Sequence, residues 1–268
     1  MRVALCQITS VRDPGVNLEQ VRQGVAQAAG KGASIVLFPE ATMAGFGASL
    51  VSVSEPLDGP WASGVRQVAD AHGVLVVTGM FTPASSDRVF NTLLVTGRGY
   101  HLGYHKIHLF DAFGFRESQT VVAGNEMRTV VAEGIGIGLT TCYDVRFPEL
   151  FQALADRGAA VILLGASWGD GDSKREQWEL LVRARALDST CWLLACGQAD
   201  PRASSITTDP KAPTGIGYST VVDPTGRIHA QLGSAPDMLV VDVDSELVES
   251  TRQAIPVLAN RRLPLKRE

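Results

Sequence analysis

The sequence predicts an α/β protein, because short apolar runs typical of buried strands alternate along the chain with amphipathic helical patterns. The first unit shows this alternation: a strand is predicted over 2–8, a helix over 17–30 and a second strand over 33–38. Val21 and Val25 lie on one face of that helix, and a glycine marks its end. We therefore expect sheets covered by layers of helices.

The rest of the chain continues the alternation. A helix is predicted over 61–72 and a strand over 74–80. The strands predicted over 90–96 and 99–105 are joined by a Gly-Arg-Gly turn, which favours an antiparallel pair. Further strands are predicted over 129–132, 136–141, 160–164 and 191–197, further helices from Pro148 onwards and over about 173–187, and a strand–turn–strand unit over 220–230.

Composition limits the possible partners. The chain of 268 residues is expected to form one domain over 1–268, since no linker rich in proline, serine or charge divides it. Its formal net charge is −4, with acidic and basic residues interspersed, so it lacks the basic field that nucleic acids and anionic membranes require. We expect a small-molecule substrate, and neither a nucleic-acid nor a membrane partner.

Two further observations favour a cytoplasmic location. No apolar stretch reaches the roughly 18 residues of a membrane span, and the N-terminus opens into a strand pattern without the arrangement of a signal peptide. Cys6, Cys142, Cys191 and Cys196 lie within apparent strands and not in a loop-rich disulfide framework, which fits a reducing compartment. Cys191 and Cys196 are five apart, so they face opposite sides of a strand and cannot pair.

Cys142 occupies a position where a nucleophile can act. It follows the apolar run 134–141 and precedes Pro148, the predicted first turn of a helix. Its thiol therefore lies in a strand-to-helix turn, a common place for a nucleophile in α/β enzymes. The alternative is a buried structural thiol, which is the commoner role for a cysteine.

Two other segments carry complementary groups. Glu40 follows a strongly apolar strand in Ile35-Val-Leu-Phe-Pro-Glu40, and Lys106 lies in an apolar and aromatic stretch, Tyr104-His-Lys106-Ile-His-Leu-Phe110. A buried lysine is costly without a carboxylate partner, and Glu40 can provide one. A carboxylate base, an ammonium group and a thiol together suffice for nucleophilic acyl chemistry.

These segments resemble the motifs of the nitrilase, or carbon–nitrogen hydrolase, superfamily, whose catalytic triad is Glu, Lys and Cys in that chain order. The matching motifs are Phe38-Pro-Glu40, His105-Lys-Ile-His-Leu109 and Cys142-Tyr-Asp-Val-Arg-Phe-Pro-Glu-Leu150, and segments 177–186 and 217–226 are similar to later blocks of the Nit branch. That branch holds the omega-amidases and the deaminated-glutathione amidases. The resemblance implies a four-layer α-β-β-α sandwich and extends over nearly the whole chain.

The resemblance also implies a mechanism. Glu40 is the expected base, Cys142 the nucleophile that forms a thioester, and the Lys106 ammonium and the backbone N–H of Tyr143 the expected oxyanion donors. Glu117, in Phe113-Gly-Phe-Arg-Glu117-Ser, is similar to an additional active-site glutamate of the Nit branch that positions the lysine. The alternative for Glu117 is an exposed loop residue.

The sequence around the nucleophile also bears on the substrate. Tyr143 and Asp144 after the cysteine resemble the amidases, whereas nitrile-cleaving relatives usually carry Trp-Glu, so we expect a small primary amide as the substrate. Arg146 matches an arginine that grips the substrate carboxylate in N-carbamoyl amino-acid hydrolases; the alternative is an ion pair with Asp144 or Glu149.

One segment departs from the Nit branch. Gly165-Ala166-Ser167-Trp168 replaces the usual Pro-x-Ala-Phe, and Gln177 replaces a usual histidine. Ala166 and Trp168 are accordingly expected to shape the pocket wall. The expected activity is hydrolysis of a carboxylate-bearing primary amide to an acid and ammonia. The alternatives are an N-carbamoyl amino-acid hydrolase, a nitrilase, or a binding or assembly protein that has lost its activity.

Neither a metal nor an organic cofactor is expected. On an extended segment His101 and His105 face one way and His108 the other, and no acidic or cysteine cluster completes a site. The glycines of 134–138 lack the spacing of a dinucleotide-binding loop. By resemblance we expect a homodimer or higher homo-oligomer, with the tail at about 254–268 packing on a partner subunit.

Overall fold

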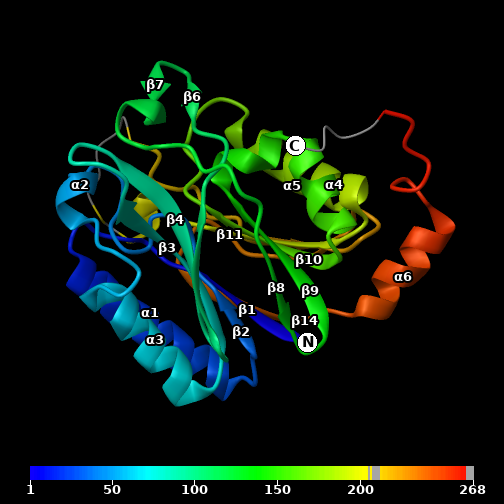
Figure 1. Ribbon diagram of the computed structural model, residues 1–268, viewed down its shortest axis with the longest axis horizontal. Helices are drawn as coiled ribbons and strands as arrows, with labels where there is room; N and C mark the ends of the chain where they lie inside the picture. Colours follow the sequence, from blue (N-terminus) through cyan, green and yellow to red (C-terminus); the bar gives the residue numbers. More distant parts are fainter. Residues whose placement is uncertain (205, 207–211, 264–268) are drawn as a thin grey trace.

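Two six-stranded sheets pack face to face and helices cover both outer surfaces, as the ribbon of the computed structural model shows (Figure 1). The structure describes residues 1–204, 206 and 212–263. The order of layers is helix, sheet, sheet, helix. Both the α/β class and the four-layer sandwich expected from the sequence are therefore confirmed.

The first sheet has the order β14-β1-β2-β3-β4-β5. The three central strands run parallel and the outer pairs are antiparallel. Strands β1 and β2 are buried on both faces, which explains their nearly continuous apolar sequence. The bounds are β1 (Arg2–Gln7), β2 (Ile35–Leu37), β3 (Leu75–Pro83), β4 (Val89–Gly97), β5 (Tyr100–His105) and β14 (Asp237–Asp242).

The second sheet repeats this arrangement with the order β13-β12-β11-β10-β9-β8. Strands β9, β10 and β11 are parallel, and the antiparallel strands lie at both edges. The strand–turn–strand unit predicted after residue 220 forms the antiparallel pair β12–β13. The bounds are β8 (Thr129–Ala132), β9 (Ile135–Thr141), β10 (Ala159–Ala166), β11 (Trp192–Gly197), β12 (Thr220–Val222) and β13 (Ile228–Gln231).

Helices α1 (Pro14–Gly30) and α3 (Pro60–His72) cover the first sheet, and α4 (Pro148–Asp156) and α5 (Lys174–Ser189) cover the second (Figure 1). Helix α1 begins three residues before the predicted start. The carboxylate of Asp13 accepts a hydrogen bond from the backbone N–H of Gly15 at 2.8 Å, and proline follows the cap directly. This is a favourable helix start, because the cap satisfies an otherwise unpaired donor.

Three apolar layers hold the sandwich together. The central layer between the sheets includes Leu5, Leu37, Leu139 and Leu163, all fully buried. One further layer lies beneath α1 and α3 and another beneath α4 and α5. Apolar burial contributes about 25 cal/mol per Å², so these layers are the main source of stability.

Two later elements, β14 and α6 (Ser245–Ala254), were not among those predicted from the sequence. Strand β14 is a sheet edge whose residues are mostly only half-buried, although it contains the apolar run Met-Leu-Val-Val over 238–241. Helix α6 does carry a start signal, since the carboxylate of Asp244 accepts a hydrogen bond from the N–H of Glu246 at 2.8 Å. Shorter pieces are α2 (Leu50–Val53), the hairpin β6 (Asp111–Ala112) and β7 (Phe115–Arg116), and the 3₁₀ turns Glu117–Gln119, Cys142–Arg146 and Pro201–Ser204.

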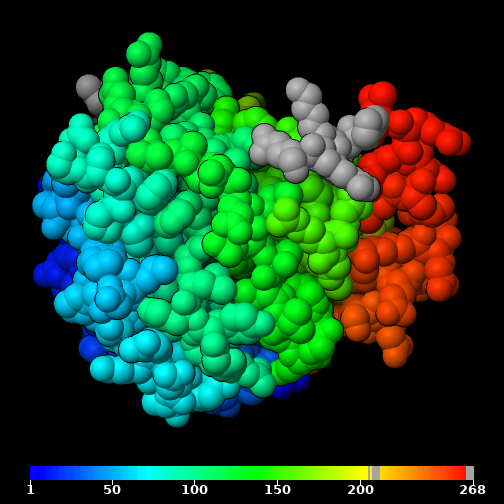
Figure 2. Space-filling view, in the orientation of Figure 1, coloured from blue at the N-terminus to red at the C-terminus, as the bar shows by residue number. Residues whose placement is uncertain are grey.

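Helix α6 and the residues after it form a ridge along one side of the molecule (Figure 2). In this ridge the Arg261 guanidinium contacts the carboxylate of Asp156 on α4 at 2.6 Å, while Leu263 is largely exposed. Part of the tail expected to reach a partner subunit, 264–268, lies outside the described residues. Within the described part of the chain, no helix is both long enough and apolar enough to cross a bilayer.

Candidate active site

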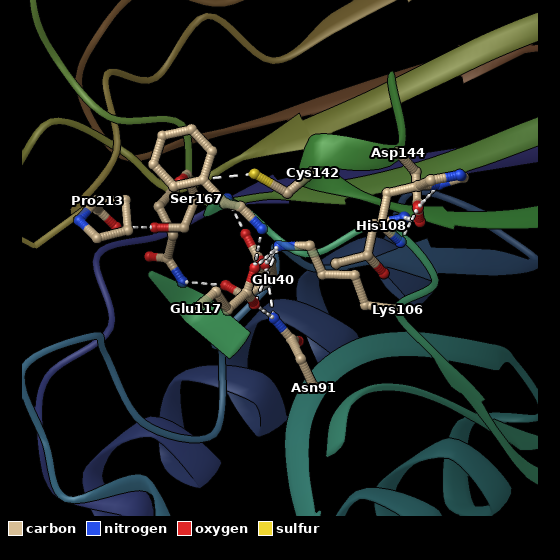
Figure 3. A network of polar contacts seen from close by, with 12 residues as sticks. Glu40, Asn91, Lys106, His108, Glu117, Cys142, Asp144, Ser167 and Pro213 are labelled. Atoms are coloured by element: carbon tan, nitrogen blue, oxygen red, sulfur yellow. Dashed lines mark hydrogen bonds and ion pairs between the residues drawn. The ribbon is translucent and has the colours of Figure 1, made fainter. Parts of the chain in front are cut away.

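Three strand ends bring the predicted catalytic side chains together. Glu40 lies three residues beyond β2, Lys106 directly follows β5, and Cys142 directly follows β9. The first two belong to one sheet and the third to the other, and all three line one cavity. Figure 3 shows these side chains converging between the sheets.

The backbone presents Cys142 in an unusual conformation. Its φ is +45°, in the left-handed region that non-glycine residues seldom adopt. The residue begins a 3₁₀ turn, and the backbone N–H of Thr141 donates to Oδ2 of Asp144 at 2.9 Å, which fixes the turn. The thiol lies 3.8 Å from the carbonyl oxygen of Ser167. A strained turn of this kind costs about 1–3 kcal/mol and is typical of functional sites.

Lys106 is fully enclosed by carboxylates. Its Nζ donates to Oε1 of Glu40 at 2.9 Å and to Oε1 and Oε2 of Glu117 at 3.1 and 2.9 Å. All three side chains are at most 3% exposed. Glu117 is thus a buried partner of the lysine and not the exposed loop residue of the alternative interpretation.

The carboxylate of Glu40 is held by donors on both oxygens. Oε1 accepts from Lys106 and from Nδ2 of Asn91 at 2.8 Å, and Oε2 accepts from the backbone N–H of Ser167 at 2.8 Å. Asn91 also donates to Glu117 at 3.0 Å, so it bridges the two carboxylates. Asn91 was missed from the sequence; its signal was a polar residue in an apolar strand, which needs a buried partner.

A glycine makes room for this carboxylate. A Cβ atom on Gly79 of β3 would lie 2.7 Å from Cα of Glu40 and 2.5 Å from the backbone nitrogen of Ala41. Such distances are not tolerated, so only glycine allows β3 to approach the Glu40 turn. Ala41 itself has a φ of +57°, which places a second strained residue beside the site.

The charges in the cavity set the protonation states. Burial and the negative charge of Glu40 raise the pKa of the Cys142 thiol well above its usual value, and the nearby Lys106 only partly opposes them. Burial alone would lower the pKa of Lys106, but Glu117 and Glu40 outweigh it and hold that pKa well above its usual value. The resting site therefore holds a neutral thiol and an ammonium group.

The empty space of the cavity, together with its opening to solvent, is about 410 Å³. Its floor is the polar group of Glu40, Lys106, Glu117 and Cys142. Its remaining lining is mostly aromatic, apart from one further cation, and consists of Phe46, Phe110, Phe115, Tyr143, Ser167, Trp168, Gly169, Lys174 and Pro213. A pocket of this kind, apolar with a few convergent polar groups, suits a small organic molecule.

Comparison with known proteins agrees with this geometry. Residues 2–253 match the family model described as carbon-nitrogen hydrolase. The chain belongs to the carbon–nitrogen hydrolase family. It is therefore a hydrolase of carbon–nitrogen bonds other than peptide bonds, as the three motifs predict.

Two relatives indicate which branch of the family the chain resembles. The chain is 49% identical over 267 residues to hydrolase Rv0480c of Mycobacterium tuberculosis, with 97% of this chain and 95% of the relative covered. It is 35% identical to the deaminated glutathione amidase of Escherichia coli O157:H7, covering 95% and 94%. The expected similarity to the Nit branch is thereby confirmed.

A solved structure is also similar. The chain matches a mutant amidase from Nesterenkonia sp. AN1 with a TM-score of 0.79 and 26% identity, covering 96% of this chain and 98% of the other. In that amidase acrylamide has undergone Michael addition at the active site cysteine.

Not every expected substrate-binding residue of this carbon–nitrogen hydrolase reaches the cavity. Trp168 does line it. Ala166 does not: it is fully buried in the apolar layer beneath α4 and α5, and its neighbour Ser167 takes the place at the wall. The reason is the alternation of side chains along β10, which turns Ala166 away from the site.

Arg146 lies outside the cavity lining and does not form the alternative ion pair. Its guanidinium donates to Oε1 of Gln177 at 2.7 Å and lies 5.1 Å from the centre of the Trp168 ring, so it sits behind the cavity wall. The ion pair with Asp144 or Glu149 does not form among the described residues. Gln177, which stands where Nit relatives usually have histidine, gives the arginine a neutral acceptor.

A second polar group of the carbon–nitrogen hydrolase links its strand ends. The carboxylate of Asp144, fully buried, accepts from the Tyr104 hydroxyl at 2.6 Å and contacts Nδ1 of His108 at 2.7 Å. Tyr104 and His108 flank Lys106, whereas Asp144 lies two residues beyond Cys142. This carboxylate therefore ties the lysine segment to the nucleophile turn.

The two histidines of β5 contact threonines of the neighbouring strand. His101 and His105 share one face of β5 and contact Thr96 and Thr92 of β4. In the described part of the chain, no three His, Cys, Asp or Glu side chains are arranged to hold a metal ion.

Proposed function

We propose that this protein hydrolyses the primary amide of a small, carboxylate-bearing molecule to an acid and ammonia, through a thioester on Cys142. The observation that carries the proposal is the shared cavity, in which the thiol, the fixed carboxylate of Glu40 and the ammonium of Lys106 meet. The amidases among the relatives support an amide over other carbon–nitrogen substrates.

In the first half of the proposed reaction, Glu40 accepts the proton of the Cys142 thiol. This help is needed because the raised pKa leaves the resting sulfur protonated. The sulfur forms a bond to the amide carbon, and the carbonyl electrons move onto oxygen, where the Lys106 ammonium and the backbone N–H of Tyr143 stabilise the charge. Glu40 then passes the proton to nitrogen as the carbon–nitrogen bond breaks, and ammonia leaves.

In the second half, Glu40 takes a proton from water, whose oxygen attacks the thioester carbon. The same donors hold the new oxyanion. The carbon–sulfur bond breaks, the sulfur regains its proton from Glu40, and the carboxylic acid leaves. Glu117 acts through Lys106: its two hydrogen bonds fix the ammonium at the position where the oxyanion forms.

Ammonia release tests this proposal. Purified wild-type protein is assayed on carboxylate-bearing omega-amides, aliphatic amides, N-carbamoyl amino acids and nitriles, beside Cys142→Ala and Cys191→Ser. Cys191 is buried away from the cavity, so its variant controls for the loss of a thiol. We expect release from an amide by the wild type and the control only, with an acyl adduct on Cys142 detected by mass spectrometry after acid quenching.

Other results would change the substrate class or the role assigned to the protein. Release only from N-carbamoyl compounds or only from nitriles would move the protein to those classes. Full turnover by Cys142→Ala would remove the cysteine from the mechanism, and a folded protein inactive on every class would favour a binding or assembly role.

We also propose that the protein is a single domain that works in the cytoplasm as a homo-oligomer. All four cysteines are free, which supports a reducing compartment. Leu180 and Leu187 of α5 are 68% and 41% exposed, and these apolar side chains support a subunit contact on that helix. Light scattering of the purified protein tests the oligomeric state, and fractionation of the source cells tests the location.

A further inference from the structure

The cavity contains a cation that the proposed reaction does not use. Lys174 is the first residue of α5 and lines the same cavity as Cys142 and Lys106. Its side chain is half-buried. The ion pairs of α5 are made by Arg175 and Arg185, and none of the described residues provides a carboxylate partner for Lys174.

Three aromatic rings hold this ammonium in place, and we call them the aromatic collar: Phe110, Phe113 and Trp168. Its nitrogen lies 3.9 Å from the centre of the Phe113 ring, 5.4 Å from Phe110 and 5.6 Å from Trp168. Ring faces attract a cation but do not use up its N–H donors as an acceptor oxygen would. The ammonium is therefore positioned and still able to bind an anion.

One ring of the collar, Trp168, is itself fixed to the fold. The indole N–H of Trp168 donates to the backbone carbonyl of Lys174 at 2.9 Å, which ties the ring to the start of α5. Behind it, the Trp168 ring packs on Trp178 with 5.3 Å between ring centres. A cation held by such a support loses less freedom on binding a ligand than a mobile surface lysine.

The floor of the cavity carries more negative than positive charge, so an anionic substrate needs a further cation such as Lys174. Two carboxylates, Glu40 and Glu117, surround the single ammonium of Lys106. An anionic substrate approaching that floor would be repelled unless its charge found a partner elsewhere. Arg146 is a second cation near Lys174, but it is not among the lining residues and one of its N–H groups is bonded to Gln177.

We propose that Lys174, held in the aromatic collar, is the specificity-determining residue that binds the negatively charged end of the substrate while the amide end lies at Cys142. The inference rests on the proposed function, since it assigns the two ends of an amide substrate to one cavity. The substrate class is an amide that carries a carboxylate at its far end. The Trp168 side of the collar is buried and shields part of this contact from water, whereas Phe113 is 75% exposed.

The test compares glutaramate with its neutral isostere glutaramide. Lys174→Met should lower kcat/KM for glutaramate by about 10- to 100-fold, mainly through KM, since a hydrogen-bonded charge pair contributes about 1.5–3 kcal/mol. Glutaramide should be almost unaffected. Lys174→Arg should keep most of the preference and Lys174→Glu should reverse it. Lys31→Met, at an exposed lysine directly after the end of α1, is the matched control and should match the wild type.

A binding measurement separates this inference from the proposed reaction. Calorimetry of glutarate with Cys142→Ala and with Cys142→Ala/Lys174→Met needs no turnover, and we expect the second variant to lose the affinity. An equal fall in turnover on both amides, or equal glutarate affinity in both variants, would overturn the role of Lys174 and leave the amidase proposal intact. Lysine-dependent glutarate binding without any amide turnover would support Lys174 and reject the reaction.

Discussion

Oε2 of Glu40 accepts a hydrogen bond from the backbone N–H of Ser167 at 2.8 Å, although the two residues follow strands of different sheets. Because Lys106 and Asn91 occupy the other oxygen, the carboxylate is surrounded by donors. It has little freedom to rotate, and the orientation that a proton acceptor needs is built into the fold.

Glu40→Gln should abolish most turnover, because the amide cannot accept the thiol proton and its NH₂ group must face one of the donors. We expect kcat to fall by at least about 10²- to 10⁴-fold, the usual contribution of a general base. Steady-state ammonia release measures this, with Glu19→Gln on the exposed face of α1 as the control. Turnover within a factor of a few of wild type would mean that another group accepts the proton.

Asp144→Asn should weaken the link between the lysine segment and the nucleophile turn. The amide would retain a bond to Tyr104 or His108 but not all of its present contacts, so we expect a loss of about 1–3 kcal/mol in the free energy of unfolding. A lower kcat should accompany it, because Cys142 begins the same turn. Urea unfolding and kinetics are compared with Asp70→Asn, an exposed control; equal values for both variants would show that Asp144 does not position the site.

Gly79→Ala should damage the site without altering any polar group. The added Cβ would press on the backbone of Glu40 and Ala41, and overpacking of this kind costs about 1–3 kcal/mol. Activity should fall more than that of Gly30→Ala, where the added methyl meets nothing. A variant with full activity and unchanged unfolding would mean that β3 moves away freely.

The stability of the protein should fall at alkaline pH in a way that depends on Cys142. Burial and Glu40 raise the pKa of this thiol well above its usual value in the folded state, whereas the unfolded chain releases the proton near about pH 8.5. Above that pH the folded state binds more protons, so the free energy of unfolding decreases as pH rises, by at most about 1.4 kcal/mol per pH unit for this group.

Urea unfolding between pH 7 and 10 under reducing conditions checks the prediction. The Cys142→Ala variant should lose stability less steeply than the wild type over the alkaline range, while below about pH 8 the slopes should agree. Parallel curves up to pH 10 would show that the folded thiol ionises as easily as the unfolded one.

Much of the fold follows from local sequence patterns. The buried strands and the amphipathic helices α1, α3, α4 and α5 were predicted close to their observed bounds, because each carries a period that only one secondary structure satisfies. Strand β14 was missed although its apolar run over 238–241 is typical of a strand; what the sequence does not show is its partner, β1, more than 200 residues away in the chain.

The site residues likewise fall into those that the sequence predicts and those that only the structure places. Glu40, Lys106 and Cys142 could be located because each lies just after a predicted strand, in a motif that resembles the carbon–nitrogen hydrolases. The position of Ala166 could not be predicted, because it depends on which way β10 turns its side chains. The position of Arg146 could not be predicted either, because it depends on a neutral partner, Gln177, on helix α5. Lys174 gave no signal, since a lysine at a helix start normally faces solvent; only the packing of the hairpin and Trp168 places it at the cavity.

Because the reacting groups are divided between two sheets, the chain can be split into two fragments that are active only when they reassemble. A cut between residue 117 and the start of β8 would leave Glu40 and Lys106 on one fragment and Cys142 and Ser167 on the other, so neither piece alone would hold a complete set. The second fragment also carries β14, which pairs along six residues with β1 of the first. Recovered ammonia release would then report reassembly of the two fragments, with the chemistry itself as the readout.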